Sequence, residues 1–170
     1  TQVAVREGDT LTDDNTVESI DETGGVAIND FFNEVAFHGD VVDPGAGGDT
    51  KKAVFTSEGL IAKEGDTLAD GTTIVDDIDE TGGVAINIFG DVAFHGDVVG
   101  PGAGTDTVRA VFTHDGLVAK EGDILPDGTI LEEISEPGGV AINFSGDVAF
   151  HGRTGGVKAV FTQYGLVAKV

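Results

Sequence analysis

The sequence predicts an all-β protein, built from three tandem four-stranded antiparallel units in a propeller-like or prism-like array. The first observation is a repeat, since Glu-Gly-Asp begins at Glu7, Glu64 and Glu121, with a spacing of 57 residues. The second is composition, because 27 glycines and a hydrophobic fraction of 39% are typical of short strands and many turns. The third is that the apolar runs are apolar on both faces, as in small sheets packed against one another.

Each unit repeats the same order of short motifs. These are Glu-Gly-Asp, a turn with Asp-Gly or Asp-Asn, Gly-Gly-Val-Ala-Ile-Asn, Val-Ala-Phe-His-Gly, Ala-Val-Phe-Thr, and Gly-Leu-Val/Ile-Ala-Lys. Residues 1–170 therefore form a single repeat domain, with units at about 7–63, 64–120 and 121–170. The third unit is shorter only between His151 and Ala159, where a glycine- and proline-rich insert of the other units is missing. Such length variation marks a surface loop.

Four strands are predicted in each unit, and the second unit shows them most clearly. They cover residues 84–87, 91–95, 110–113 and 117–120. Short turns that contain glycine join the first two and the last two, as in tight hairpins. A turn at residues 126–128 precedes a fifth short strand between units.

The predicted strands alternate bulky residues with alanine, as in Val92, Ala93 and Phe94. Alanine leaves room for a neighbouring sheet, so we expect close sheet-to-sheet contact on the alanine side. In the first unit the hairpin after Asn29 has one residue more than in the second. We expect a bulge or a longer turn to absorb it, because a register slip would reverse the two faces of the strand.

The charge of the chain argues against two classes of partner. The formal net charge is −22, from 31 acidic and 9 basic side chains. Such a surface repels nucleic acid and anionic membranes, and no apolar run approaches the roughly 20 residues of a membrane helix. We therefore expect no nucleic-acid binding and no membrane insertion. Cysteine is absent, so no disulfide framework exists.

The motif N-x-x-G-x-V-A-F occurs at Asn87 to Phe94 and again at Asn143 to Phe150. Together with the recurring Gly-Leu-Val-Ala-Lys-Glu-Gly-Asp, it resembles the bacterial extracellular tandem repeats of the NxxGxxxF type, found in proteins with a choice of C-terminal anchors. The resemblance covers nearly the whole chain and implies secretion or surface display and a propeller-like repeat. It carries over no catalytic residues. The first unit departs from the motif, with no glycine before Val35.

One strand is surplus within the chain. The Leu-Val-Ala-Lys type of strand occurs four times, against three copies of Ala-Val-Phe-Thr. The candidate assembly strands at the two ends are Val3, Ala4, Val5 and Arg6, and Leu166, Val167, Ala168 and Lys169. The chain could be cut from a longer repeat array, or the first strand could close the last sheet, which already owns its own fourth strand. In the third alternative, which we favour, the first strand pairs with a neighbouring molecule by strand addition.

His38, His95 and His151 share one repeat position, as do Asn29, Asn87 and Asn143. Three imidazoles that converge on a pseudo-threefold axis could bind zinc. However, a residue present in every unit is more often part of the repeat structure. We expect these residues to be structural, with each histidine hydrogen-bonded to the backbone of a neighbouring loop.

Calcium is the better candidate metal, because it prefers several carboxylate and carbonyl oxygens. The Glu-Gly-Asp segments offer the pairs Asp9 and Asp13, Asp66 and Asp70, and Asp123 and Asp127. The alternative is that these residues only form turns, which Asp and Gly favour. No other cofactor is predicted.

The sequence predicts no enzyme, since it contains neither a Ser-His-Asp grouping nor a zinc-protease motif. The favoured function is that of a structural subunit that joins copies of itself head to tail, by strand addition, into an extracellular filament or ring. The alternative is a carbohydrate- or surface-binding propeller-type module, with calcium as an optional ligand. For that role Tyr164 is the aromatic residue that lies outside the apolar repeat positions.

Overall fold

The computed structural model describes residues 5–11, 14–23, 25–42, 48–78, 80–99, 107–135, 137 and 139–169, with the backbone alone for Asp76 and Glu80. Strands make up 59% of the structure and helix 2%. The predicted all-β fold of three antiparallel units is confirmed. No helix in the described part of the chain is long and apolar enough to cross a membrane.

The strands form three sheets, one after the other along the chain. The N-terminal sheet contains β1 (Thr16–Ile20), β2 (Val26–Asn29), β3 (Glu34–Val42), β4 (Thr50–Thr56) and β5 (Gly59–Lys63). The middle sheet contains β6 (Ile74–Ile78), β7 (Val84–Ile86), β8 (Val92–Val99), β9 (Thr107–Thr113) and β10 (Gly116–Lys120), with a short 3-10 helix, η2 (Glu80–Gly82), before β7. The C-terminal sheet contains β11 (Glu133–Ile134), β12 (Val140–Ile142), β13 (Val148–Thr154), β14 (Val157–Thr162) and β15 (Gly165–Lys169).

At one edge of each sheet, two short strands lie end to end and both pair with the same neighbouring strand. In the N-terminal sheet β1 and β2 both pair with β3, since Val17 lies opposite Val41 and Val26 lies opposite Phe37. The path then continues from β3 to β4 and β5. The fifth strand predicted after the inter-unit turn is therefore present as β6 and β11, and it forms half of the outer edge.

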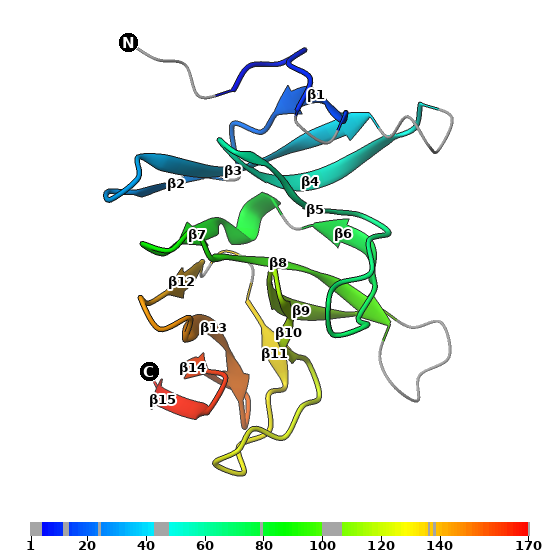
Figure 1. Cartoon of the computed structure of the whole chain (residues 1–170). Helices are drawn as coiled ribbons and strands as arrows, with labels where there is room; N and C mark the ends of the chain where they lie inside the picture. Colours follow the sequence, from blue (N-terminus) through cyan, green and yellow to red (C-terminus); the bar gives the residue numbers. More distant parts are fainter. Residues whose placement is uncertain are drawn as a thin grey trace.

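The three sheets stack face to face in one column, with the N-terminal sheet at the top of Figure 1 and the C-terminal sheet at the bottom. Each sheet has a phenylalanine face, such as Phe94 and Phe112, and an alanine face, such as Ala93. One core packs the phenylalanine face of the middle sheet against the alanine face of the N-terminal sheet. The second core repeats this contact between the C-terminal and middle sheets. The close approach expected on the alanine side is confirmed.

Paired aromatic rings fill each phenylalanine face. Phe94 lies opposite Phe112 in the ladder, and their ring centroids are 5.6 Å apart with planes at 22°. The corresponding pairs of the other sheets have centroids 5.4 and 5.8 Å apart. Cross-strand aromatic pairs stabilise a sheet beyond the apolar area that they bury.

The Glu-Gly-Asp turns have one geometry in all three units. The amide of Gly65 donates to the carbonyl of Ile74 at 2.8 Å, and Gly8 donates to Val17 at 2.7 Å. The positive φ of 87° at Gly65 and 85° at Gly8 is the left-handed conformation that glycine adopts without strain. The first turn therefore has the same geometry as the other two, although no strand among the described residues precedes it.

The longer hairpin of the first unit keeps the register of the others. Val26 lies opposite Phe37 just as Val84 lies opposite Phe94. The extra residue is taken up in the turn, where Asn33 has a φ of 55°. The expectation that the turn would absorb this residue is confirmed.

The two predicted assembly strands differ in the structure. Leu166 to Lys169 form most of β15, which pairs with β14. Val5 and Arg6 lie outside any strand of the single chain, and their predicted pairing with a neighbouring molecule stays a prediction. They form no strand here because a strand needs a partner, and no described strand lies beside them. Val3 and Ala4 fall outside the described residues.

We expect that removing one ring of a buried phenylalanine pair strongly destabilises the fold. Phe112→Ala should lower the free energy of unfolding by about 3–5 kcal/mol, because Phe112 is fully buried between two sheets. Phe89→Ala, on a residue that is 66% exposed, should change it by less than about 0.5 kcal/mol. Guanidinium unfolding followed by circular dichroism measures both. Equal losses would contradict the stacked arrangement.

Candidate functional site

The alanine face of the C-terminal sheet is open, whereas the same face of the other two sheets is covered. Val54 and Val111 are fully buried on the covered faces, but the corresponding Val160 is only half-buried. Ala168 on β15 is exposed, while its counterparts Ala62 and Ala119 are buried. We call this open surface the end face and define it by Ala149, His151, Val160 and Ala168.

The three repeated histidines do not converge. His38 lies in β3, His95 in β8 and His151 in β13, so each belongs to a different sheet. His38 and His95 are 0% and 2% exposed between sheets, and His151 is exposed on the end face. A hydrogen bond of 3.1 Å joins His95 Nδ1 to the carbonyl of Gly82, as expected for a structural histidine. The zinc alternative therefore has no geometric basis.

A basic cleft of about 470 Å³ opens beside the end face. Its charged lining comes from Arg109, Glu133, Arg153 and Lys158, together with His151. Arg153 forms an ion pair with Glu133 at 3.2 Å. The cleft thus holds three of the chain's nine basic residues on a protein whose net charge is −22.

The cleft carries a like-charge pair that the other units lack. Arg153 lies directly opposite Lys158 in the ladder, whereas Asp97 lies opposite Arg109 at the same place in the middle sheet. Like charges directly opposite one another destabilise a sheet. Glu133 neutralises Arg153, and Lys158 is exposed beside it.

The opposite end of the stack also exposes apolar residues. Val26 and Ile28 on β2 are 67% and 59% exposed, whereas Val84 and Ile86, their counterparts, are packed under the preceding sheet. Further along this face, Val5 and Leu11 of the N-terminal turn pack over the core of the first sheet. We call this surface the start face and define it by Val26 and Ile28 with the N-terminal turn.

The carboxylates predicted to bind calcium accept hydrogen bonds from the chain. Asp9, Asp66 and Asp123 each accept from the backbone amide three residues earlier, at 2.8, 3.0 and 3.0 Å. Asp70 accepts from the amides of Thr72 and Leu117, and Asp127 accepts from those of Thr129 and Leu166. The described residues contain no group of three or more His, Asp or Glu that could hold a metal ion. Asp13 lies outside the described residues, and calcium binding stays an untested prediction.

Asp70 and Asp127 act as clips between a turn and an edge strand. Leu117 lies in β10 and Leu166 in β15, the last strands of their sheets, so each carboxylate holds an amide near the start of an edge strand. The hydrogen bonds from Leu117 and Thr72 lower the pKa of Asp70 below its usual 3.8. Those from Thr129 and Leu166 lower the pKa of Asp127 in the same way. Sequence reasoning missed this role because the partner strand lies far along the chain.

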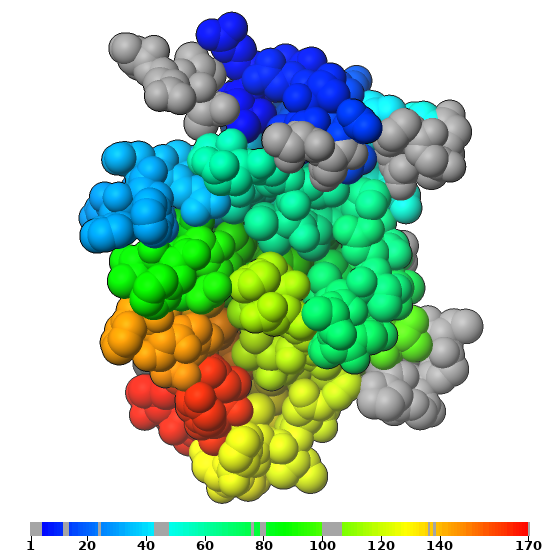
Figure 2. Space-filling view, in the orientation of Figure 1, coloured from blue at the N-terminus to red at the C-terminus, as the bar shows by residue number. Residues whose placement is uncertain are grey.

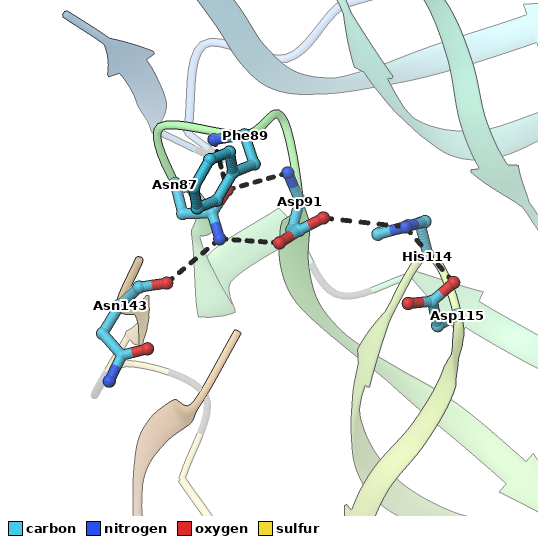
Figure 3. Close-up of polar contacts among 6 residues, drawn as sticks. All are labelled: Asn87, Phe89, Asp91, His114, Asp115 and Asn143. Carbon is cyan, nitrogen blue, oxygen red and sulfur yellow. Dashed lines mark hydrogen bonds and ion pairs between the residues drawn. The ribbon is translucent and has the colours of Figure 1, made fainter. Parts of the chain in front are cut away.

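The repeated asparagines hold the hairpin turns, as expected for structural residues. Asn87 Oδ1 accepts from the amides of Phe89 and Asp91 at 2.9 and 3.0 Å, and its Nδ2 donates to Asp91 at 2.7 Å (Figure 3). The same Nδ2 donates to the carbonyl of Asn143 in the next hairpin at 3.0 Å. Asn29 and Asn143 accept from the turn amides in a similar way.

Sequence reasoning also missed the exposed aromatic residues. Phe31, Phe32, Phe89 and Phe144 are 63–74% exposed, although they were counted as apolar repeat positions. Their place in a polar turn, just after the repeated asparagine, is the signal that could have identified them. Tyr164 is also exposed, and its hydroxyl donates to Asp147 at 2.8 Å, which raises the pKa of the Tyr164 hydroxyl.

Fold and surface together define a class: a tandem-repeat β protein whose units stack through unlike faces, with the alanine face open at the C-terminal end of the stack and Val26 and Ile28 exposed at the other end. The chain belongs to DUF7453, a family of unknown function, whose family model matches residues 28–168. No curated protein and no solved structure matches it.

The histidine position provides a matched pair of variants. His95→Ala should lower the free energy of unfolding by about 2 kcal/mol or more, because it leaves a cavity and removes the bond to Gly82. His151→Ala should change it by less than about 0.5 kcal/mol, because the same side chain is exposed there. Urea unfolding of both variants is the measurement. A large effect at His151 would show that the end face is covered in solution.

The carboxylate clips predict a loss of stability in acid. Since the folded state lowers the pKa of Asp70 and Asp127, their contribution is present above about pH 4 and is lost as the pH falls further. The double variant Asp70→Asn/Asp127→Asn should be less stable at neutral pH but should lose less stability on acidification. Melting temperatures between neutral and acid pH test this. Parallel curves for variant and wild type would show that the clips do not contribute.

Proposed function

We propose that this protein is a structural repeat module that associates head to tail with further copies of itself. The end face of one copy packs against the start face of the next. One observation carries the proposal: the alanine face of the C-terminal sheet is open, and at the other end of the stack Val26 and Ile28 are exposed, whereas their counterparts Val84 and Ile86 are packed under a neighbouring sheet. Such a contact joins unlike surfaces, so it gives a ring if the rotation closes and a filament if it does not.

The internal interfaces show what the contact would bury. In the middle of the stack, Phe94 and Val84 lie over Ala36, Val54 and Ala62 of the preceding sheet. In the proposed contact, Val26 and Ile28 of the next copy would lie over Ala149, Val160 and Ala168. Exposed apolar surface of this kind is typical of an interaction site.

Charge complementarity favours a second copy as the partner. The end face carries His151 and adjoins the cleft with Arg153 and Lys158. The N-terminal turn beside the start face carries Glu7 and Asp9. Opposite charges would therefore meet in the head-to-tail contact, and screening by salt should weaken it.

Strand addition is the second component of the proposal. In the internal interfaces the fourth strand runs directly into the Glu-Gly-Asp turn, as β5 ends at Lys63 beside Glu64. Arg6 holds the place of Lys63 in the next copy, but Lys169 already fills that place in the preceding copy, so the first residues would have to lie beside β15. We propose that the strand of residues 3–6 pairs with the outer edge of β15. The exposure of Val167, Ala168 and Lys169 is compatible with such an addition.

We place this assembly outside the cell, because the N-x-x-G-x-V-A-F motif resembles that of secreted and surface-displayed repeats. No catalytic role is proposed. The partner is the protein itself, and calcium is at most an accessory ligand of the aspartate-rich turns.

Two variants with one damaged face each give a sharp test. Val160→Arg places a charge in the end face, and Ile28→Arg places one in the start face. Each variant keeps only one intact face, so each alone should stay monomeric. A mixture of the two should form a heterodimer and stop there, because the only intact pair of faces is then used. Analytical ultracentrifugation over a range of concentrations, at low and high salt, measures this.

Val157→Arg is the matched control, since Val157 lies in β14 with Val160 but on the other face of the sheet. It should associate as the wild type does. Deletion of residues 1–6 should weaken association about tenfold through loss of strand pairing. A wild-type monomer at every concentration would overturn the proposal, whereas an unchanged affinity after the deletion would overturn strand addition alone.

A further inference from the structure

Three hairpin turns carry exposed aromatic rings along one edge of the stack. The turns join β2 to β3, β7 to β8 and β12 to β13, and they lie one below the other at the left of Figure 1. Phe31 is 74% exposed in the first turn, Phe89 66% in the second and Phe144 67% in the third. The same edge is formed by the blue, green and orange surfaces at the left of Figure 2. We call these rings, with Phe32 of the first turn, the aromatic column.

The sheets set the spacing of this column. β2 contacts β7, and β7 contacts β12, so the three hairpins are stacked as the sheets are. The hydrogen bond from Asn87 Nδ2 to the carbonyl of Asn143 fixes the second turn on the third. Since stacked sheets lie about 10 Å apart, successive turns of the column are separated by roughly 10 Å.

The fold itself does not require these rings. Phe89 is the second residue after its asparagine and Phe144 is the first, so the aromatic group has no fixed place in the turn. The asparagine side chains hold the turns through backbone amides. The one ring contact in the column is between Phe31 and Phe32, whose centroids are 4.8 Å apart at 84°. A single exposed apolar side chain is ordinary on a protein surface. Here exposed rings recur in all three stacked turns, and we take this recurrence to indicate contact with another molecule.

Polar groups alternate with the rings. The Glu34 carboxylate of the first hairpin lies against Gly90 of the second, where an added Cβ would be 3.0 Å from its Oε2. Asp91 and Asp147 lie at the end of the second and third turns and accept from Asn87 and Asn143. Carboxylates therefore stand between and beside the aromatic platforms. Asp91 and Asp147 also hold protein donors, among them Asn87 and Tyr164, so a ligand hydroxyl would use their remaining lone pairs.

We propose that the aromatic column binds a linear neutral polysaccharide. A pyranose ring has an apolar C–H face, which stacks on an aromatic ring, and a rim of hydroxyls, which donate to carboxylates. The carboxylates and the net charge of −22 would repel nucleic acid, anionic glycans and anionic lipid. A folded protein or a bilayer would need a continuous apolar surface, and here the rings of the three turns are separated by polar groups such as the Glu34 carboxylate. The proposal assigns a ligand site that is separate from the two end faces.

Affinity gel electrophoresis at low protein concentration tests the proposal. The gels contain hydroxyethyl cellulose, galactomannan or anionic polygalacturonate, and one gel without polysaccharide serves as the reference. We expect retardation by at least one neutral polymer and none by polygalacturonate. Phe89→Ala should weaken the binding about threefold to tenfold, because it removes the middle platform. The quadruple variant at Phe31, Phe32, Phe89 and Phe144 should abolish it.

The matched control is Ile124→Ala/Ile130→Ala, which removes two exposed apolar side chains from a different turn, 72% and 53% exposed. It should bind as the wild type does, and melting curves should show that all variants are folded. The proposal is overturned if no neutral polymer retards the protein, if the quadruple variant still binds, or if sedimentation with phosphatidylcholine vesicles depends on the same rings. Because Val160→Arg leaves the column intact, its binding to the polymer separates this site from self-association.

Discussion

The packing of a phenylalanine face against an alanine face is the contact on which the rest of the structure depends. Each small sheet is apolar on both sides, so none could be stable alone in water. Alanine at positions such as Ala93 and Ala119 lets the next sheet approach until its paired rings fill the space between them. Because the two faces of a sheet differ, the stack has a direction, and its ends cannot be alike.

Because the stack has a direction, residues at the same repeat position can differ in solvent exposure. His95 and His151 hold the same repeat position, but one is enclosed between sheets and the other faces solvent. The same is true of Ala119 and Ala168. In a stack of this kind the environment of a residue depends on whether a neighbouring unit covers it, which nearest-neighbour models of repeat proteins express as an interface energy.

Much of the architecture could be predicted from sequence because it is local or periodic. The strands, the alanine side and the longer turn after Asn29 all follow from short patterns. The sites were harder to predict. The hydrogen bond that Asp70 accepts could not be predicted because its partner amide, at Leu117, is 47 residues away. The exposure of Phe89 and Phe144 was not predicted, because an apolar residue in a short turn can face either the core or the solvent.

The carboxylate clips have a consequence for how such a protein can grow by gene duplication. Asp70 and Leu117 belong to one repeat unit, and so do Asp127 and Leu166. A block of coding sequence from one Glu-Gly-Asp to the next therefore carries both the donor and the acceptor of its own closing bond. Copying or deleting such a block leaves no carboxylate and no edge amide without its partner, so the number of units can change in evolution while the hydrogen bonds of each unit stay complete.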